Sequence, residues 1–348
     1  MKVFFERMKV QQKIMLFVIL CTGMVALTAF YLYQRVMVDP FIKETFTLQI
    51  YPHTPFQQVM DTLTHYSESK NQVFFKKLAS HYKLPDNLRP GSYRFTPGHS
   101  VVQVYRTLKR GLQTPVRVSF NNIRTVDQFA KRISDQLMLD SAAIHTLFQD
   151  TTQIAALGFT PKTFPTVFLP DSYEFYWTVT PQQFLERMHK EYQRYWNATR
   201  QAQLQVLGID ATQLAIIASI AEEETNSAHE RGVVGRLYLN RYHRKMLLQA
   251  DPTVKFALQD FTLRRILYKH LEVDSPYNTY RYVGLPPGPI RIPAKQTLDA
   301  ILNSSSHRYL YMCAKEDFSG LHNFAKTHRE HQNNANKYRQ ALNRRGIR

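Results

Sequence analysis

The chain is poor in cysteine, with only 2 in 348 residues. Cys21 lies in an apolar N-terminal run, and Cys313 lies in a short apolar segment that predicts a buried strand, so the two cannot pair and no disulfide framework exists. The sequence also lacks the His and Cys spacing of a metal site, a glycine-rich phosphate loop and a recognisable Ser-His-Asp set. We therefore expect no metal, no cofactor and no disulfide scaffold.

Only one long apolar run is present, at residues 14–33. About 20 apolar residues are needed to cross a bilayer as a helix. Four basic residues and one acidic residue precede the run, so the positive-inside rule predicts that residues 1–13 form a cytoplasmic tail. A cleaved signal peptide is the alternative, but the run is long for one and no small-x-small site follows Tyr33. We expect an uncleaved single-pass helix in the cell (inner) membrane, with the rest of the chain extracytoplasmic.

Acidic residues are scarce relative to basic ones, at 27 against 45, which gives a formal net charge of +18. Such a balance favours an anionic partner, although solubility alone is an equally good explanation. Nucleic acid is the usual partner of a basic protein. A chain that is exported and anchored meets lipid headgroups and cell-wall polymers instead, so we expect no nucleic-acid partner.

The periodicity predicts an α+β protein in three parts after the membrane helix. Residues 34–116 form a small α+β module, residues 117–180 a connecting subdomain, and residues 181–348 a larger α+β domain. We find no internal repeat and no low-complexity segment. The predicted strands are 46–51, 91–95 and 116–120, and the predicted helices are 55–66, 71–82, 100–112, 125–137, 141–149 and 181–196.

Three consecutive acids, Glu222 to Glu224, end an apolar helix. Glu222 follows small side chains, so it is expected to face a surface with room for a ligand, whereas Glu224 follows the isoleucine stripe and is expected to be the more buried carboxyl. Residues two apart on a helix project about 200° from each other, which argues against both acting on one bond. A solvated acidic helix end is the alternative, and the pattern alone does not choose between Glu222 and Glu224.

Several further sequence blocks, in the same order and spacing as in one known family, make the pattern specific for that family. In order and spacing, the region around residues 210–332 resembles the catalytic domain of the endolytic murein transglycosylases, the YceG-like family. The blocks are Ile217 to Thr225, Glu230-Arg231, Asn240-Arg241, Leu248 to Val254, Tyr277-Asn278-Thr279-Tyr280, Gly284 to Ile290, Tyr309-Leu310-Tyr311 and His322-Asn323-Phe324. The chain departs from the family pattern at Glu223, where a basic residue is usual.

The resemblance implies that Glu222, the first glutamate of the block, is the catalytic residue. It also implies cleavage of the β-1,4 bond between N-acetylmuramic acid and N-acetylglucosamine, which leaves a 1,6-anhydro-muramyl end. One carboxyl suffices, because it can first protonate the leaving oxygen and then take the proton of the muramyl 6-hydroxyl. Because that acid must carry a proton at neutral pH, we expect an apolar surround.

Other positions are expected to bind the substrate. Polar side chains at four of them can hold acetamido groups or hydroxyls, two tyrosines and an asparagine can hold a sugar face, and one histidine can donate a hydrogen bond. The alternatives are turn and cap chemistry for residues 251–253 and a core position for the aromatic residues. The candidates are Asn240, Gln249, Asp251, Thr253, Tyr277, Asn278, Tyr280 and His322.

We therefore predict a membrane-anchored enzyme that cuts nascent peptidoglycan from within and ends strand elongation. The resemblance implies a LysM-like, glycan-binding fold for residues 34–116, a transglycosylase catalytic domain for residues 181–348, and partnership with glycan polymerases and penicillin-binding proteins. One alternative is a non-catalytic, membrane-anchored scaffold that binds peptidoglycan. Another is a hydrolase of the same bond, and a third is a cytoplasmic nucleic-acid binder in which residues 14–33 are a buried core helix.

Overall fold

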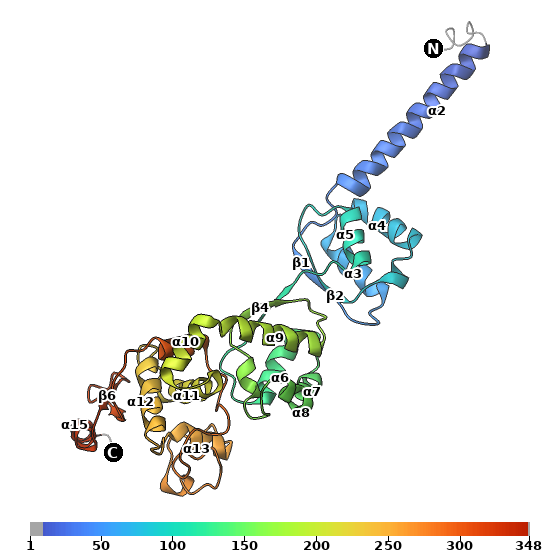
Figure 1. Ribbon diagram of the computed structural model, residues 1–348. Helices are drawn as coiled ribbons and strands as arrows, with labels where there is room; N and C mark the ends of the chain where they lie inside the picture. The colour runs from blue at the N-terminus through green and yellow to red at the C-terminus, as the bar shows by residue number, and fades with distance from the viewer. Residues whose placement is uncertain (1–9, 347–348) are drawn as a thin grey trace. The chain divides into compact units, whose positions relative to one another are not determined.

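The computed structural model describes residues 10–346, which mix helices with short strands (Figure 1). The chain divides into two compact units. Unit 1 contains the described residues up to Val116 together with residues 174–178, and unit 2 contains residues 117–173 and the chain from Val179 onward. The limits predicted for the module, the connecting subdomain and the catalytic domain stay predictions.

Unit 1 begins with a long helix, α2 (Val10–Tyr33), which continues as a π-helical turn, η1 (Gln34–Val38). The 29 residues Val10–Val38 are long and apolar enough to cross a membrane, and no part of their most apolar stretch is buried in the protein. The predicted span, residues 14–33, lies inside this helix. Residues 1–9, which carry most of the predicted cytoplasmic tail, lie outside the described residues.

The rest of unit 1 is built on one pair of strands. Strands β1 and β2 pair antiparallel, with Phe46 opposite Phe95 and Ile50 opposite Gly91. Buried and exposed residues alternate along β1, as the period of two requires when one face is covered. Helices α3 and α4 connect the strands, and α5 follows them, so the predicted strands and helices of this segment are confirmed. The elements are β1 (Phe46–Ile50), α3 (Phe56–Tyr66), α4 (Ser69–His81), η2 (Pro85–Asn87), β2 (Gly91–Phe95) and α5 (Val101–Arg110).

The first part of unit 2 packs short helices around a cluster of phenylalanines. Phe129 contacts the rings of Phe148 and Phe168, and Phe148 also contacts Phe164. Strand β3 pairs with β4, and the first residue of β3 and the last two residues of β4 are counted with unit 1. The predicted helix at 125–137 is shorter than expected and ends at Ser134. The elements are β3 (Val116–Ser119), α6 (Val126–Ser134), α7 (Ser141–Gln149), α8 (Thr151–Ala156), η3 (Phe164–Val167) and β4 (Ser172–Phe175).

The second part of unit 2 surrounds one buried helix, α11 (Ala211–Glu224), against which α12 and α14 pack. Strand β5 pairs antiparallel with β6 and contains Cys313, which is partly exposed, so the predicted strand is confirmed and its predicted burial is wrong. The other elements are α9 (Pro181–Tyr195), α10 (Ala198–Leu207), α12 (Arg231–His243), α13 (Asp251–Leu258), η4 (Tyr268–His270), α14 (Lys295–Leu302), β5 (Tyr311–Ala314), β6 (His322–Ala325) and α15 (His328–Arg344).

Gly235 lets α12 approach α14 closely. A Cβ at this position would lie 2.4 Å from the side chain of Ile301, which is fully buried. We expect Gly235→Ala to lower the free energy of unfolding by about 1–3 kcal/mol through overpacking. Urea unfolding of the variant measures this loss. Adding Ile301→Val, which removes a methyl group, should recover part of it, and the absence of any recovery would show that overpacking is not the cause.

Candidate active site

Helix α11 ends in the three acids, and its position is fixed by a capped first turn and by burial along most of its length. Asp210 caps the first turn in a capping box with Gln213, and the residues from Leu214 to Glu222 are all buried. The helix ends at Glu224, since Thr225 adopts an extended backbone. The acids therefore occupy the last turn of a rigid, buried element, where each side chain leaves the helix in a different direction.

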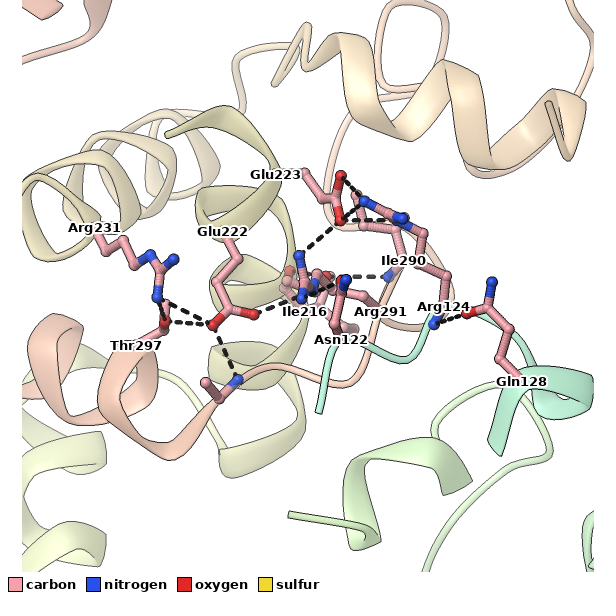
Figure 2. A network of polar contacts seen from close by, with 12 residues as sticks. Asn122, Arg124, Gln128, Ile216, Glu222, Glu223, Arg231, Ile290, Arg291 and Thr297 are labelled. Carbon is pink, nitrogen blue, oxygen red and sulfur yellow. Dashed lines mark hydrogen bonds and ion pairs between the residues drawn. The ribbon is translucent and has the colours of Figure 1, made fainter. Parts of the chain in front are cut away.

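Glu222 lies in a polar, charged surround rather than the predicted apolar one (Figure 2). Its Oε1 accepts hydrogen bonds from the hydroxyl of Thr297 at 2.6 Å and from the backbone N–H of Ala294 at 3.1 Å. The Nε of Arg291 lies 3.2 Å from Oε2, and a nitrogen of Arg231 lies 3.6 Å from Oε1. The residue is only 6% exposed, so the predicted open surface beside Glu222 is absent.

Glu223 forms the other half of this network. Its carboxylate accepts two hydrogen bonds from Arg124, at 2.9 and 3.0 Å, and one from Arg291 at 2.8 Å. Arg291 also donates to Asn122, as Figure 2 shows. The acid that stands where the family usually has a basic residue thus joins α11 to two segments that are distant in sequence. None of the three arginines of this network was predicted as a site residue; Arg231 belongs to the recognised Glu230-Arg231 block, whereas Arg124 and Arg291 lie outside the recognised blocks.

Glu224 leaves the helix on another side, as the helical spacing predicts, and it is only partly buried. The hydroxyl of Tyr238 on α12 donates a hydrogen bond to its Oε1 at 2.8 Å. Burial raises the pKa of Glu224 to about 7, and the charge of Asp251 adds to the rise, whereas Tyr238 and the charge of Arg241 oppose it. Over the whole residue Glu224 is less buried than Glu222, so the expectation that it is the more buried of the two is wrong, although the burial of its carboxyl group is what raises its pKa.

The turn before α13 brings more of the predicted residues to Glu224. Asp251, at the start of α13, accepts a hydrogen bond of 2.5 Å from the hydroxyl of Tyr280. Gln249 is exposed and has a left-handed backbone, with a φ of 50°. Thr253 is fully buried, and its hydroxyl contacts that of Thr279 at 2.8 Å. The structure thus brings Glu224, Asp251 and Tyr280 together. Gln249 lies two residues before Asp251 in the sequence, and Thr253 stabilises the turn.

The remaining predicted residues have structural partners. Asn278 is fully buried and donates to the carbonyls of Leu271 and Val273, both at 2.8 Å. Asn240 donates to the carbonyls of His307 and Tyr309. His322 lies 2.9 Å from a carboxylate oxygen of Glu230. Tyr277 is mostly buried and its ring contacts Phe256. In residues 10–346, no three His, Cys, Asp or Glu side chains are placed to hold a metal ion.

The raised pKa of Glu224 has a consequence for stability. Between its ordinary value of 4.5 and about 7, the folded protein binds this proton more tightly than the unfolded chain does, so the free energy of unfolding falls as pH rises through that window. We expect Glu224→Gln to raise the free energy of unfolding by about 2 kcal/mol near pH 8 and to change it little near pH 5. Urea unfolding at both pH values is the measurement, and an equal effect at the two would contradict the assignment.

Comparison with known proteins gives a consistent result. The model of the YceG-like family matches residues 48–337. An endolytic murein transglycosylase of Bacillus subtilis is 26% identical over an alignment 329 residues long, which covers 88% of this chain and 89% of that protein. One of Streptococcus pneumoniae is 24% identical over 80% of this chain, which spans only 55% of that longer protein. A crystal structure of a yceG-like protein from Listeria monocytogenes aligns with a TM-score of 0.56 at 26% identity, covering 83% of this chain and 98% of that one.

Proposed function

Because this chain belongs to the YceG-like family, we propose that it is an endolytic murein transglycosylase whose proton-carrying group is Glu224. The observation that carries the proposal is the grouping of Glu224 with Tyr238, Asp251 and Tyr280, in which burial of the Glu224 carboxyl raises its pKa to about 7. A group with such a pKa is protonated in a large fraction of molecules at neutral pH and can still lose its proton during a reaction cycle.

The proposed reaction needs a single carboxyl. Glu224 donates its proton to the oxygen between the muramyl and glucosaminyl units, and the bond from that oxygen to C1 of the muramyl unit breaks. The resulting carboxylate then takes the proton of the muramyl 6-hydroxyl while the hydroxyl oxygen bonds to C1, which forms the 1,6-anhydro ring and restores the acid. Because Tyr238 holds Oε1 by its hydrogen bond, we propose Oε2 as the oxygen that carries the proton. No water is consumed.

Asp251 is suited to a supporting role. The positive charge that develops at C1 in such a transition state is stabilised by a nearby carboxylate. Asp251 is exposed, and Tyr280 fixes its orientation through the hydrogen bond between them. The negative charge of Asp251 also helps to keep the proton on Glu224 before the reaction. We propose that Gln249, which is exposed beside it, contacts the amide or hydroxyl groups of the sugar.

Glu222 is the competing proposal, since the resemblance places the catalytic role there. Its side chain is 3% exposed, and two hydrogen-bond donors and two guanidinium groups surround it. A carboxyl held in this way is well suited to fix α11 against Ala294 and Thr297. We therefore propose that Glu222 positions the helix that carries Glu224.

Product analysis tests the function. The full-length protein and its Glu224→Gln variant are incubated with purified murein, and the released glycans are identified by mass spectrometry. We expect anhydro-muramyl ends from the unmodified protein and none from the variant. Reducing ends would instead show a hydrolase of the same bond. Failure of the unmodified protein to release any product would favour a scaffold that only binds peptidoglycan.

We further propose that α2 and η1 anchor the protein in the cell membrane, with the bulk of the chain outside the cytoplasm. The length, apolar character and exposure of this helix support the anchor. We also propose that the module at 34–116 is a LysM-like unit that holds glycan. Exposed tyrosines such as Tyr51 and Tyr82 offer faces on which sugars can stack. Partnership with glycan polymerases and penicillin-binding proteins is a proposal that follows from such a place at the membrane.

A further inference from the structure

A second feature of unit 2, which the reaction does not use, is a cavity of about 320 Å³. This volume lies at the small end of the range for ligand pockets in proteins, roughly 300–1,000 Å³. Some of the segments that line it precede α11 in the sequence, and the others follow it. Among the described residues that line it are three cations and no carboxylate, and most of the others are aromatic, proline or aliphatic. The cations are Arg124, Lys162 and Arg291, and the rings are Phe129, Phe148, Phe256 and Tyr277.

The charge at this cavity is not fully balanced within the protein. Two of the three cations that line it, Arg124 and Arg291, form ion pairs with Glu223 or Glu222. The third, Lys162, is exposed and forms no ion pair with the described carboxylates, so its positive charge is left without a partner in the lining. A cavity with aromatic walls and uncompensated positive charge suits a ligand that has small apolar groups and at least one carboxylate.

The cavity borders α13, the helix that begins with Asp251. A smaller pocket of about 70 Å³ shares Arg124 and Phe256 with it, and this pocket is lined as well by Glu223, Pro252 and Lys255. Pro252 directly follows Asp251, and the charge of Lys255 is near enough to lower the pKa of Glu224 slightly against the effect of burial. Helix α13 therefore forms a continuous edge from the cleavage site to the cavity. From residue 251 to residue 256 the helix rises by about 8 Å, a distance that two or three extended peptide residues span.

We propose that this cavity holds the carboxylate-bearing stem peptide attached to the muramyl unit at the cleavage site. The proposal rests on the function proposed above and adds a source of specificity to it. In murein a short acidic peptide branches from each muramyl lactyl group, so a glycan placed at Glu224 brings such a peptide to α13. The enzyme then distinguishes strands that still carry peptides from strands that have lost them.

Two substrates test this inference: glycan strands with peptides, and the same strands after an amidase has removed the peptides. The full-length protein is compared with Lys162→Glu and with a matched control, Lys190→Glu, which reverses an exposed charge on α9 away from the cavity lining. We expect Lys162→Glu to lower kcat/KM on peptide-bearing strands about tenfold, the effect of losing one charge-assisted contact. We expect it to leave kcat/KM on stripped strands unchanged, and Lys190→Glu to change neither.

Direct binding separates this proposal from the function on which it rests. Binding of the soluble probe N-acetylmuramyl-L-alanyl-D-glutamate is followed by NMR for the three proteins. Binding that Lys162→Glu weakens and Lys190→Glu does not supports the cavity even where no cleavage is detected. Binding that Lys162→Glu leaves unaltered, or an equal loss of kcat/KM on both substrates, would overturn the proposal.

Discussion

Replacing Glu224 by Gln is expected to lower the rate of glycan cleavage by about a thousandfold. The amide keeps the size of the side chain and can still accept the hydrogen bond from Tyr238. It cannot donate a proton to the leaving oxygen or take one from the 6-hydroxyl, and a positioned acid or base contributes roughly 10²–10⁴-fold to a rate. The measurement is the initial rate of product release from murein, together with the thermal midpoint of unfolding to show that the variant is folded.

Glu222→Gln is the matched comparison, because it makes the same change two residues earlier on the same helix. The amide introduced there would keep the acceptor for Thr297 and Ala294 and lose the charge that faces Arg231 and Arg291. We expect this variant to lose stability and to retain cleavage below its unfolding temperature. A folded Glu222→Gln protein without activity, beside an active Glu224→Gln protein, would instead assign the chemistry to Glu222.

Arg291→Ala is expected to lower the free energy of unfolding by about 3–5 kcal/mol, the usual cost of removing one partner from a buried ionic network. Arg291 is only 14% exposed, and it contacts both Glu222 and Glu223. Without it, Glu222 keeps only the more distant Arg231 as an ionic partner, and Glu223 keeps Arg124. Urea unfolding of the full-length protein near pH 7 measures the loss.

The control for this prediction is an exposed ion pair. Lys131 pairs with Asp135 on the surface of unit 2, with 77% of the lysine side chain exposed, so Lys131→Ala should cost no more than about 0.5 kcal/mol. Adding Glu223→Gln to Arg291→Ala removes one of the unpaired charges and should restore part of the stability. Equal losses for Arg291→Ala and Lys131→Ala would show that the network contributes little.

The local structure of this protein could largely be predicted from its sequence. The strands at Phe46–Ile50 and Gly91–Phe95 follow the alternation of polar and apolar residues, and α7 was placed at its observed bounds, 141–149. Errors arose at helix ends. Helix α5 stops at Arg110 because Gly111 adopts a left-handed backbone, with a φ of 68°, and the periodic pattern continues past that point.

The surroundings of the acids were harder to predict. The helical periodicity correctly predicted that Glu222 and Glu224 leave the helix in different directions. The burial of each side chain, however, depends on which distant segment of the chain packs over it. The segment that covers Glu222 is held to α11 by the hydroxyl of Ser219, which accepts from the N–H of Ile290 at 3.1 Å, and it supplies Arg291 and Ala294. Arg291 directly follows the Gly284 to Ile290 block, and Tyr238 lies two residues before Asn240. Proximity to a recognised block was therefore the only signal in the sequence for either residue.

The continuity of α2, η1 and the first module limits where the protein can work. A helix of 29 residues is about 43 Å long, while the hydrocarbon core of a bilayer is about 30 Å thick. Only two residues separate Val38, the last helical residue, from Phe41, which is already part of the module core. On the proposal that α2 and η1 cross the membrane, so short a connection keeps the module close to the lipid headgroups. A module that binds glycan from that position, as proposed above, would reach strands near the membrane and not wall farther out, so the anchor would select strands by their distance from the membrane.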